Sequence, residues 1–234
     1  MGALEAAAWG AFGASSLLIG AWLALHWRAP RGTVGMVMGF GAGALLAAIA
    51  YELIPSGFGA DAWLFAAFGL GAVVFYRLDR AVTRRVSPGA GSAQRSIALG
   101  ALLDGIPESM VLGMSVAQGG TVGVAFLAAV FLSNLPESLG ATSTMGATGG
   151  GPHRPYRIWW LIVGLSALAA AVGYTVVTLL PSADGTYAEA FAAGAVLTML
   201  ADSMIPEAYA QGGKATGLLT VLGFAVAGAL SAMA

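Results

Sequence analysis

The sequence predicts an all-α integral membrane protein with eight transmembrane helices. The chain has 234 residues, of which 58% are hydrophobic and only 9% are charged. Soluble domains are usually about 25% charged, so the composition is that of a membrane protein. Eight apolar runs lie close to the length of about 20 residues that an α-helix needs to cross a bilayer. We therefore expect one transmembrane domain over residues 1–234 and no soluble domain.

The eight runs are separated by short polar or glycine-rich segments. We expect the spans at Leu4–Leu25, Thr33–Ile54, Ala60–Tyr76, Ser96–Val116, Thr121–Ala141, Ile158–Leu180, Tyr187–Tyr209 and Thr216–Met233. The longest connection, residues 77–95, contains five arginines and a stretch of Ser, Pro and Gly. Such a composition predicts a flexible basic loop on the cytoplasmic side.

All ten Lys and Arg residues fall on one side of this arrangement, in the first, third, fifth and seventh loops. Cytoplasmic loops collect Lys and Arg, so we expect that side to face the cytoplasm and both termini to lie outside it. The outer side instead carries Asp61, Asp184 and Glu189. The expected location is the cell (inner or plasma) membrane, with the lipid bilayer as the surroundings of every span.

Acidic residues occur inside the expected spans, whereas Lys and Arg do not. A charge at the centre of a membrane helix costs about 2.5–3.5 kcal/mol on insertion scales. Because no basic partner is available, the acids either carry protons or are neutralised by mobile cations, and a transporter can use both. The six acids are Glu52, Asp104, Glu108, Glu137, Asp202 and Glu207.

Two neighbouring spans carry variants of one motif. Residues 104–109 read Asp-Gly-Ile-Pro-Glu-Ser, and residues 133–138 read Ser-Asn-Leu-Pro-Glu-Ser. The first and fifth positions of each motif are four residues apart and share one helix face. Each proline also leaves a backbone carbonyl without its helical donor. Carboxylate, hydroxyl, amide and carbonyl oxygens together indicate a divalent cation site.

A second pair of motifs places an acid before Ile-Pro. Residues 51–56 read Tyr-Glu-Leu-Ile-Pro-Ser, and residues 202–207 read Asp-Ser-Met-Ile-Pro-Glu. Their spans run in opposite directions, which is the pattern of inverted repeats relating helices 1–3 to helices 6–8. We expect Glu52 to line the outer half of a transport path, and Asp202 and Glu207 its inner half. The nine methionines are scattered over several spans and are interpreted as packing residues.

On these motifs the chain resembles the ZIP (Zrt/Irt-like) family of divalent metal transporters, as a divergent prokaryotic-type member. The family pattern is His-Asn-x-Pro-Glu-Gly in the fourth helix and a His or Gln followed by Pro-Glu in the fifth. Here Asp104 and Gly105 replace His and Asn, and Ser133 stands where His or Gln is usual. The resemblance implies a 3+2+3 arrangement around helices 4 and 5. It also implies a metal site formed by Asp104, Glu108, Asn134, Glu137 and Ser133.

The resemblance implies transport of divalent metal cations by alternating access, with Zn²⁺ as the first candidate. Loss of imidazole favours a shift toward Mn²⁺ or Fe²⁺, because carboxylate sites suit Mn²⁺. The sixth span, at residues 163–173, has no acid, so we expect a single bound metal. The metal is cargo, and we expect no prosthetic cofactor, no nucleic-acid partner and no enzymatic activity. A homodimer is left open.

Three alternatives stay open from the residues alone. The same acids could relay protons in a carrier of an organic solute. They could also line a cation channel. An intramembrane protease built on Asp104 and Asp202 is disfavoured, because the Gly-x-Gly-Asp and Tyr-Asp contexts of two-aspartate proteases are missing.

Overall fold

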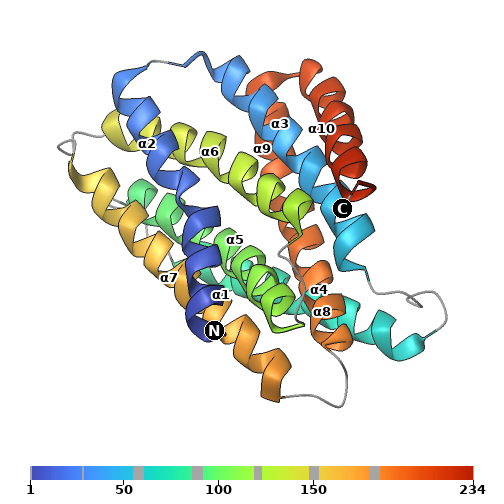
Figure 1. Cartoon of the computed structure of the whole chain (residues 1–234). Helices are drawn as coiled ribbons and strands as arrows, with labels where there is room; N and C mark the ends of the chain where they lie inside the picture. Colours follow the sequence, from blue (N-terminus) through green and yellow to red (C-terminus); the bar gives the residue numbers. More distant parts are fainter. Residues whose placement is uncertain are drawn as a thin grey trace.

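The computed structural model describes residues 2–27, 29–54, 61–85, 92–118, 123–147, 153–179 and 185–233. Helices account for nearly all of this described part, and no strand occurs in it (Figure 1). The helices are α1 Ala3–Ala14, α2 Ser16–His26, α3 Arg31–Ala48, α4 Ala62–Arg85, α5 Ser92–Ala117, α6 Val124–Ala147, α7 His153–Leu179, α8 Thr186–Met199, α9 Ile205–Gly212 and α10 Ala215–Ser231. Two π-helical turns, η1 Ile49–Leu53 and η3 Leu200–Met204, continue α3 and α8.

Helices occupy the described residues of all eight expected spans almost completely, as expected for a multi-pass all-α membrane protein. Seven helical segments of the described chain are long and apolar enough to cross a bilayer. The eighth, Ala215–Ser231, has 17 residues. At 1.5 Å per residue it is about 25 Å long, slightly less than the hydrocarbon core of about 30 Å.

The first span is bent rather than straight. Ser15 separates α1 from α2, and its hydroxyl donates to the carbonyl of Phe12 at 2.6 Å. The hydroxyl of Ser16 donates to the carbonyl of Gly13 at 3.0 Å. Serine hydroxyls that compete for carbonyls of the preceding turn bend helices, and this accounts for the break within Leu4–Leu25.

The expected basic loop at residues 77–95 is largely helical, so its predicted boundaries were wrong. Helix α4 runs to Arg85 and α5 begins at Ser92, and residues 86–91 lie outside the described part. Arginine is a good helix former, so a helix need not end where its apolar stretch ends. One turn of α4 also gains from Arg80, whose Nη1 donates to the hydroxyl of Tyr76 at 2.6 Å.

Glycines bring the long helices into backbone contact. Helix α3 packs most extensively on α10, α4 on α8, and α5 on α7. A Cβ atom on any of several glycines would collide with a carbonyl oxygen of the facing helix, so no larger residue fits there without separating the pair. These contacts are Gly43 to Thr220, Gly223 to Phe40, Gly71 to Phe191, Gly194 to Phe68 and Gly113 to Ala170.

Large apolar side chains cover the outside of the bundle, and small ones fill much of its interior. Trp63, Leu161 and Leu218 are 74%, 63% and 75% exposed, whereas many of the fully buried residues are alanines. A water-soluble protein rarely exposes so many large apolar side chains. This distribution fits a bundle whose outer surface is covered by lipid.

The two π turns have their wide hydrogen bonds in place. In η1 the N–H of Ile54 donates to the carbonyl of Ile49 at 2.9 Å, and in η3 the N–H of Ile205 donates to the carbonyl of Leu200. Both bonds span five residues instead of four. Such turns occur frequently at functional sites. Pro206 follows η3 at the start of α9, while Pro55 and Ser56 lie outside the described residues.

Candidate cation site

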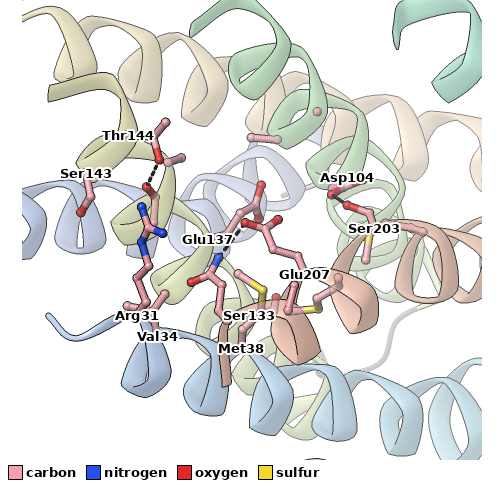
Figure 2. Close-up of a pocket in the computed structure, with 18 of the residues that line it drawn as sticks. Arg31, Val34, Met38, Asp104, Ser133, Glu137, Ser143, Thr144, Ser203 and Glu207 are labelled. Atoms are coloured by element: carbon pink, nitrogen blue, oxygen red, sulfur yellow. Dashed lines mark hydrogen bonds between the residues drawn. The ribbon is translucent and has the colours of Figure 1, made fainter. Parts of the chain in front are cut away.

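A cavity of about 640 Å³ lies between α3, α5, α6 and the segment from the end of α8 to α9 (Figure 2). Its lining extends to Ala29 and Arg31 at the start of α3 and to Gln211 at the end of α9. These helix ends belong to the side of the bundle that carries the basic residues. The polar side chains of the lining include Asp104, Glu108, Ser133, Glu137, Ser203 and Glu207; Glu108 and Ser133 are buried, whereas Glu207 is exposed.

The two Pro-Glu motifs meet in this cavity, as their spacing predicts. Pro107 lies inside α5 and Pro136 inside α6, so each glutamate follows a proline within a continuous helix. Glu108 is only 2% exposed, and its Oε2 atom has no hydrogen-bond partner among the described residues. A buried carboxyl oxygen without a partner is unfavourable, so a cation that reached this atom would stabilise it.

Glu137 faces several other carboxylates. Asp104, Glu108 and Glu207 are all close enough to repel a charge on Glu137. Figure 2 shows the side chains of Glu137 and Glu207 reaching toward one another from α6 and α9. Glu207 is partly satisfied, because Nε2 of Gln211 donates to its Oε1 at 2.9 Å. Four carboxyl groups thus share one space.

Two serines hold this polar centre. The Oγ of Ser203 in η3 donates to Oδ2 of Asp104 at 3.1 Å and links the seventh span to the fourth (Figure 2). The Oγ of Ser133 donates to the carbonyl of Val130 at 2.9 Å. A hydroxyl has a single hydrogen, so Ser133 can donate either to Val130 or to the neighbouring carboxyl of Glu108, and its oxygen keeps lone pairs for the cavity.

Asn134 does not belong to the cavity lining, although the resemblance made it a candidate ligand. Its Nδ2 lies 3.5 Å from the carbonyl of Gly13 in α1 and can donate to it. Asn134 follows Ser133 directly, and successive residues of a helix point about 100° apart. Ser133 therefore faces the cavity while Asn134 faces α1.

Two of the three expected path residues lie elsewhere. Asp202 is exposed on η3 and does not line the cavity. Glu52 is half-buried near the start of α6, where its Oε2 accepts from the N–H of Phe126 at 3.2 Å. Of the three acids that we expected to line a transport path, Glu207 alone lines this cavity.

The opposite end of the bundle is joined by polar contacts. Besides the bond from Phe126 to Glu52, Nε2 of Gln118 donates to Oε1 of Glu189 and links the end of α5 to α8. The hydroxyl of Tyr187 donates to Oδ2 of Asp61 at 3.2 Å, which links α8 to the start of α4. Asp184 lies outside the described residues.

The carboxylates are neighbours but do not form a ready ligand cage. Across the residues that the structure covers, no group of three or more His, Cys, Asp or Glu side chains could hold a metal ion together. Arg31, at the mouth, is the only basic residue in the described lining. A bound cation would therefore need ligands of other kinds besides two carboxylates.

The sequence interpretation missed several residues of the lining. Ser203 and Gln211 hold Asp104 and Glu207 in place. Met38, Met199 and Met204 line the same cavity, although we expected the methionines to be packing residues. Helical spacing alone could have paired Gln211 with Glu207, which is four residues earlier. The other four depend on tertiary contacts that no local pattern reveals.

In comparisons with protein-family models and with curated proteins, the chain matches none. The resemblance to the ZIP family thus rests on the eight expected spans, the two Pro-Glu motifs and the two Ile-Pro motifs, and it stays a prediction.

Proposed function

We propose that this protein transports divalent metal cations across the membrane through the cavity between α5 and α6. The observation that carries the proposal is the unpartnered, fully buried Oε2 of Glu108, in a cavity shared with Asp104, Glu137 and Glu207. Hydrogen bonds satisfy Asp104 and Glu207 in part. Glu108 and Glu137 are therefore the acids with most to gain from a cation.

The charge balance of the cavity favours a cation over an anionic or neutral cargo. Among the described residues, the cavity is lined by four carboxyl groups and by one guanidinium, that of Arg31, which lies at the mouth. Each membrane-buried charge costs about 2.5–3.5 kcal/mol on insertion scales, so a divalent ion between Glu108 and Glu137 offsets an unfavourable term. The lone pairs of Ser133 supply a further oxygen. Release then proceeds past Glu207 toward the basic end.

The ZIP-like 3+2+3 arrangement and its inverted repeats are part of this proposal. Residues 40–54 and 191–205 carry the same features at the same positions. Each segment begins with Phe, has Gly at its fourth position and a π turn over its tenth to fourteenth positions, and ends with Ile. In both segments the Gly packs against a backbone carbonyl of another span. This correspondence supports a common origin of helices 2 and 7.

The orientation is proposed from the basic residues. If the end carrying Arg31 faces the cytoplasm, both termini lie outside and the cavity extends inward. The contacts of Glu52 and Glu189 then close the outer end. Alternating access requires these contacts to break when the cavity opens outward. The proposed cargo is Zn²⁺ by resemblance, with Mn²⁺ and Fe²⁺ as further candidates.

Uptake by the purified full-length protein in proteoliposomes tests the proposal. Vesicles carrying a trapped metal-sensitive dye should take up Zn²⁺ at a saturable rate. Glu108→Gln and Glu137→Gln should each abolish uptake, because an amide keeps the size of the side chain but cannot offset a cation's charge. Glu5→Gln, an exposed acid in the first turn of α1, is the matched control and should transport normally.

Retained uptake in both cavity variants would contradict the site. A rate that rises linearly with concentration, without saturation, would instead favour a channel through the same cavity.

A further inference from the structure

Helix α4 has an exposed face that changes from apolar to basic along its length. Leu70 and Val73 are 57% and 52% exposed, and Arg77, Arg80 and Arg84 are exposed too. These five residues follow one another at intervals of three, four, three and four positions, so they lie in a row along one face of the helix. We call this row the α4 stripe.

The opposite side of α4 faces the protein. Gly71 and Phe75 are buried there, and Asp79, four residues further on, is close enough to Asp104 of α5 to repel its charge. Asp79 is the only acid in the sequence of α4, and helix geometry turns it about 100–160° away from the three arginines. The α4 stripe therefore has no carboxylate of its own to neutralise it.

Arg80 is held in place where the apolar part of the stripe gives way to the basic part. Its Nη1 donates to the hydroxyl of Tyr76 at 2.6 Å, and its guanidinium lies 5.9 Å from the centre of the Tyr76 ring. Tyrosine is enriched at membrane–water interfaces, where its ring is in apolar surroundings and its hydroxyl is hydrated. A guanidinium has five N–H donors, so Arg80 keeps donors for another partner.

The apolar part of α4 is shorter than the hydrocarbon core. Residues 62–76 span about 22 Å at 1.5 Å per residue, against a core of about 30 Å, and any tilt shortens this reach further. Such a mismatch is accommodated by local thinning of the bilayer and by flanking side chains that extend to the headgroups. The exposed arginines thus lie at the depth where lipid headgroups meet the acyl chains.

The charge of the α4 stripe indicates what covers it. A second copy of the chain, related by a two-fold axis along the membrane normal, would bring its own three arginines to the same depth, and the like charges would repel. Phosphate groups have the opposite charge, and a guanidinium binds them with two parallel hydrogen bonds. Acyl chains fit the exposed Leu70 and Val73 in the same row.

We propose that the α4 stripe is a binding site for anionic phospholipids, with Arg77, Arg80 and Arg84 on the headgroup phosphates and the acyl chains on Leu70 and Val73. Phosphatidylcholine also has a phosphate, but the guanidinium groups repel its choline cation, so lipids with a net negative charge bind more tightly. The proposal goes beyond transport, because the stripe shares no residue with the cavity lining.

Native mass spectrometry of the purified full-length protein in detergent tests the proposal. Phosphatidylglycerol and phosphatidylcholine are titrated separately, and the lipids retained by the intact protein are counted. The unaltered protein should bind phosphatidylglycerol about a hundredfold more tightly, since each arginine near a headgroup contributes about fivefold. The triple variant R77Q/R80Q/R84Q should lose this preference, and Arg84→Gln alone should lower it about fivefold.

Lys214→Gln is the matched control, because it removes an exposed basic side chain that lies outside α4. It should keep the preference for phosphatidylglycerol. R77K/R80K/R84K retains the charges and should keep more of the preference than the glutamine variant does. Glu108→Gln, which should abolish metal uptake, should bind phosphatidylglycerol normally, so failure of the lipid site and failure of the cation site are distinguishable.

Equal binding of the two lipids by the unaltered protein, or an unchanged preference in the folded glutamine variant, would overturn the proposal. If that variant does not fold, high salt should still weaken the binding of phosphatidylglycerol to the unaltered protein, since salt screens exposed charges. Inorganic phosphate should not displace the lipid, because it has no acyl chain to cover Leu70 and Val73. Displacement by inorganic phosphate would show a site for soluble anions instead of lipid.

Discussion

At the scale of single residues, the candidate site depends on contacts between helices that are distant in the sequence. Asp104 is held by a hydroxyl from η3, 99 positions later in the chain. The paired Pro-Glu motifs predicted that Glu108 and Glu137 lie together, and both residues line the cavity. Asn134 was misplaced, because the rotation of α6 against α1 is set by tertiary packing.

The bond from Ser203 to Asp104 predicts a positioning role for the serine. Ser203→Ala should raise the KM for metal uptake roughly fivefold, since a hydrogen bond contributes about 1 kcal/mol. Ser203→Thr keeps the hydroxyl and should restore most of the loss. Uptake curves of the three proteins in vesicles measure the effect. If the alanine and threonine variants behave alike, the hydroxyl has no such role.

At the scale of helices, the sequence predicted the number and type of elements better than their ends or their faces. Apolar run length located all eight spans, because the bilayer imposes that length. The length of the apolar runs did not predict that α4 continues to Arg85. A helix can extend beyond the bilayer into water, and its apolar run ends earlier than the helix does. The apolar runs also did not predict η1 and η3, since a change from α to π hydrogen bonding has no reliable local signature.

The glycine contacts make a prediction at this scale. A Cβ on Gly113 would strike the carbonyl oxygen of Ala170, and a backbone atom of a packed helix cannot rotate aside as a side chain can. Gly113→Ala should therefore separate α5 from α7 and destabilise the protein by about 1–3 kcal/mol, the usual range for overpacking. Thermal unfolding in detergent, followed by tryptophan fluorescence, measures it.

Gly164→Ala is the control for that experiment. Gly164 also lies in α7, but nothing lies within 4 Å of where its Cβ would be. It should leave the melting temperature unchanged or raise it slightly, because alanine favours helix over glycine. Equal destabilisation by both substitutions would contradict the close-packing interpretation of α5 and α7.

At the scale of the whole molecule, the two ends of the bundle differ. The cavity lining extends to the end with Arg31 and Gln211, and polar contacts join the helices at the other end. The placement of all Lys and Arg residues in alternate loops predicted that the two ends of the bundle differ in charge. It could not predict at which end the cavity is accessible, because that depends on the relative tilt of whole helices.

Single cysteines test this asymmetry, since the native chain has none. Ser143→Cys, in the cavity lining, should react with a membrane-impermeant thiol reagent only from the cytoplasmic side, and Zn²⁺ should slow the reaction. Val124→Cys, exposed at the start of α6, should react only from the outside and at a rate independent of Zn²⁺. The reverse pattern would invert the proposed orientation.

The π turn at Leu200–Met204 also has a genetic consequence. Such a turn is equivalent to one extra residue in an α-helix, so an in-frame deletion of the single codon for Ala201 would restore regular α hydrogen bonding. Because the deletion would remove only the residue that the wide turn accommodates, the later side chains of that span would keep their direction relative to α8. Gly212 would stay against Gly35 of α3, and Glu207 would stay in the cavity. A reading frame one triplet shorter would thus encode a more regular helix with the same later contacts, and the change would be confined to the turn that carries Ser203.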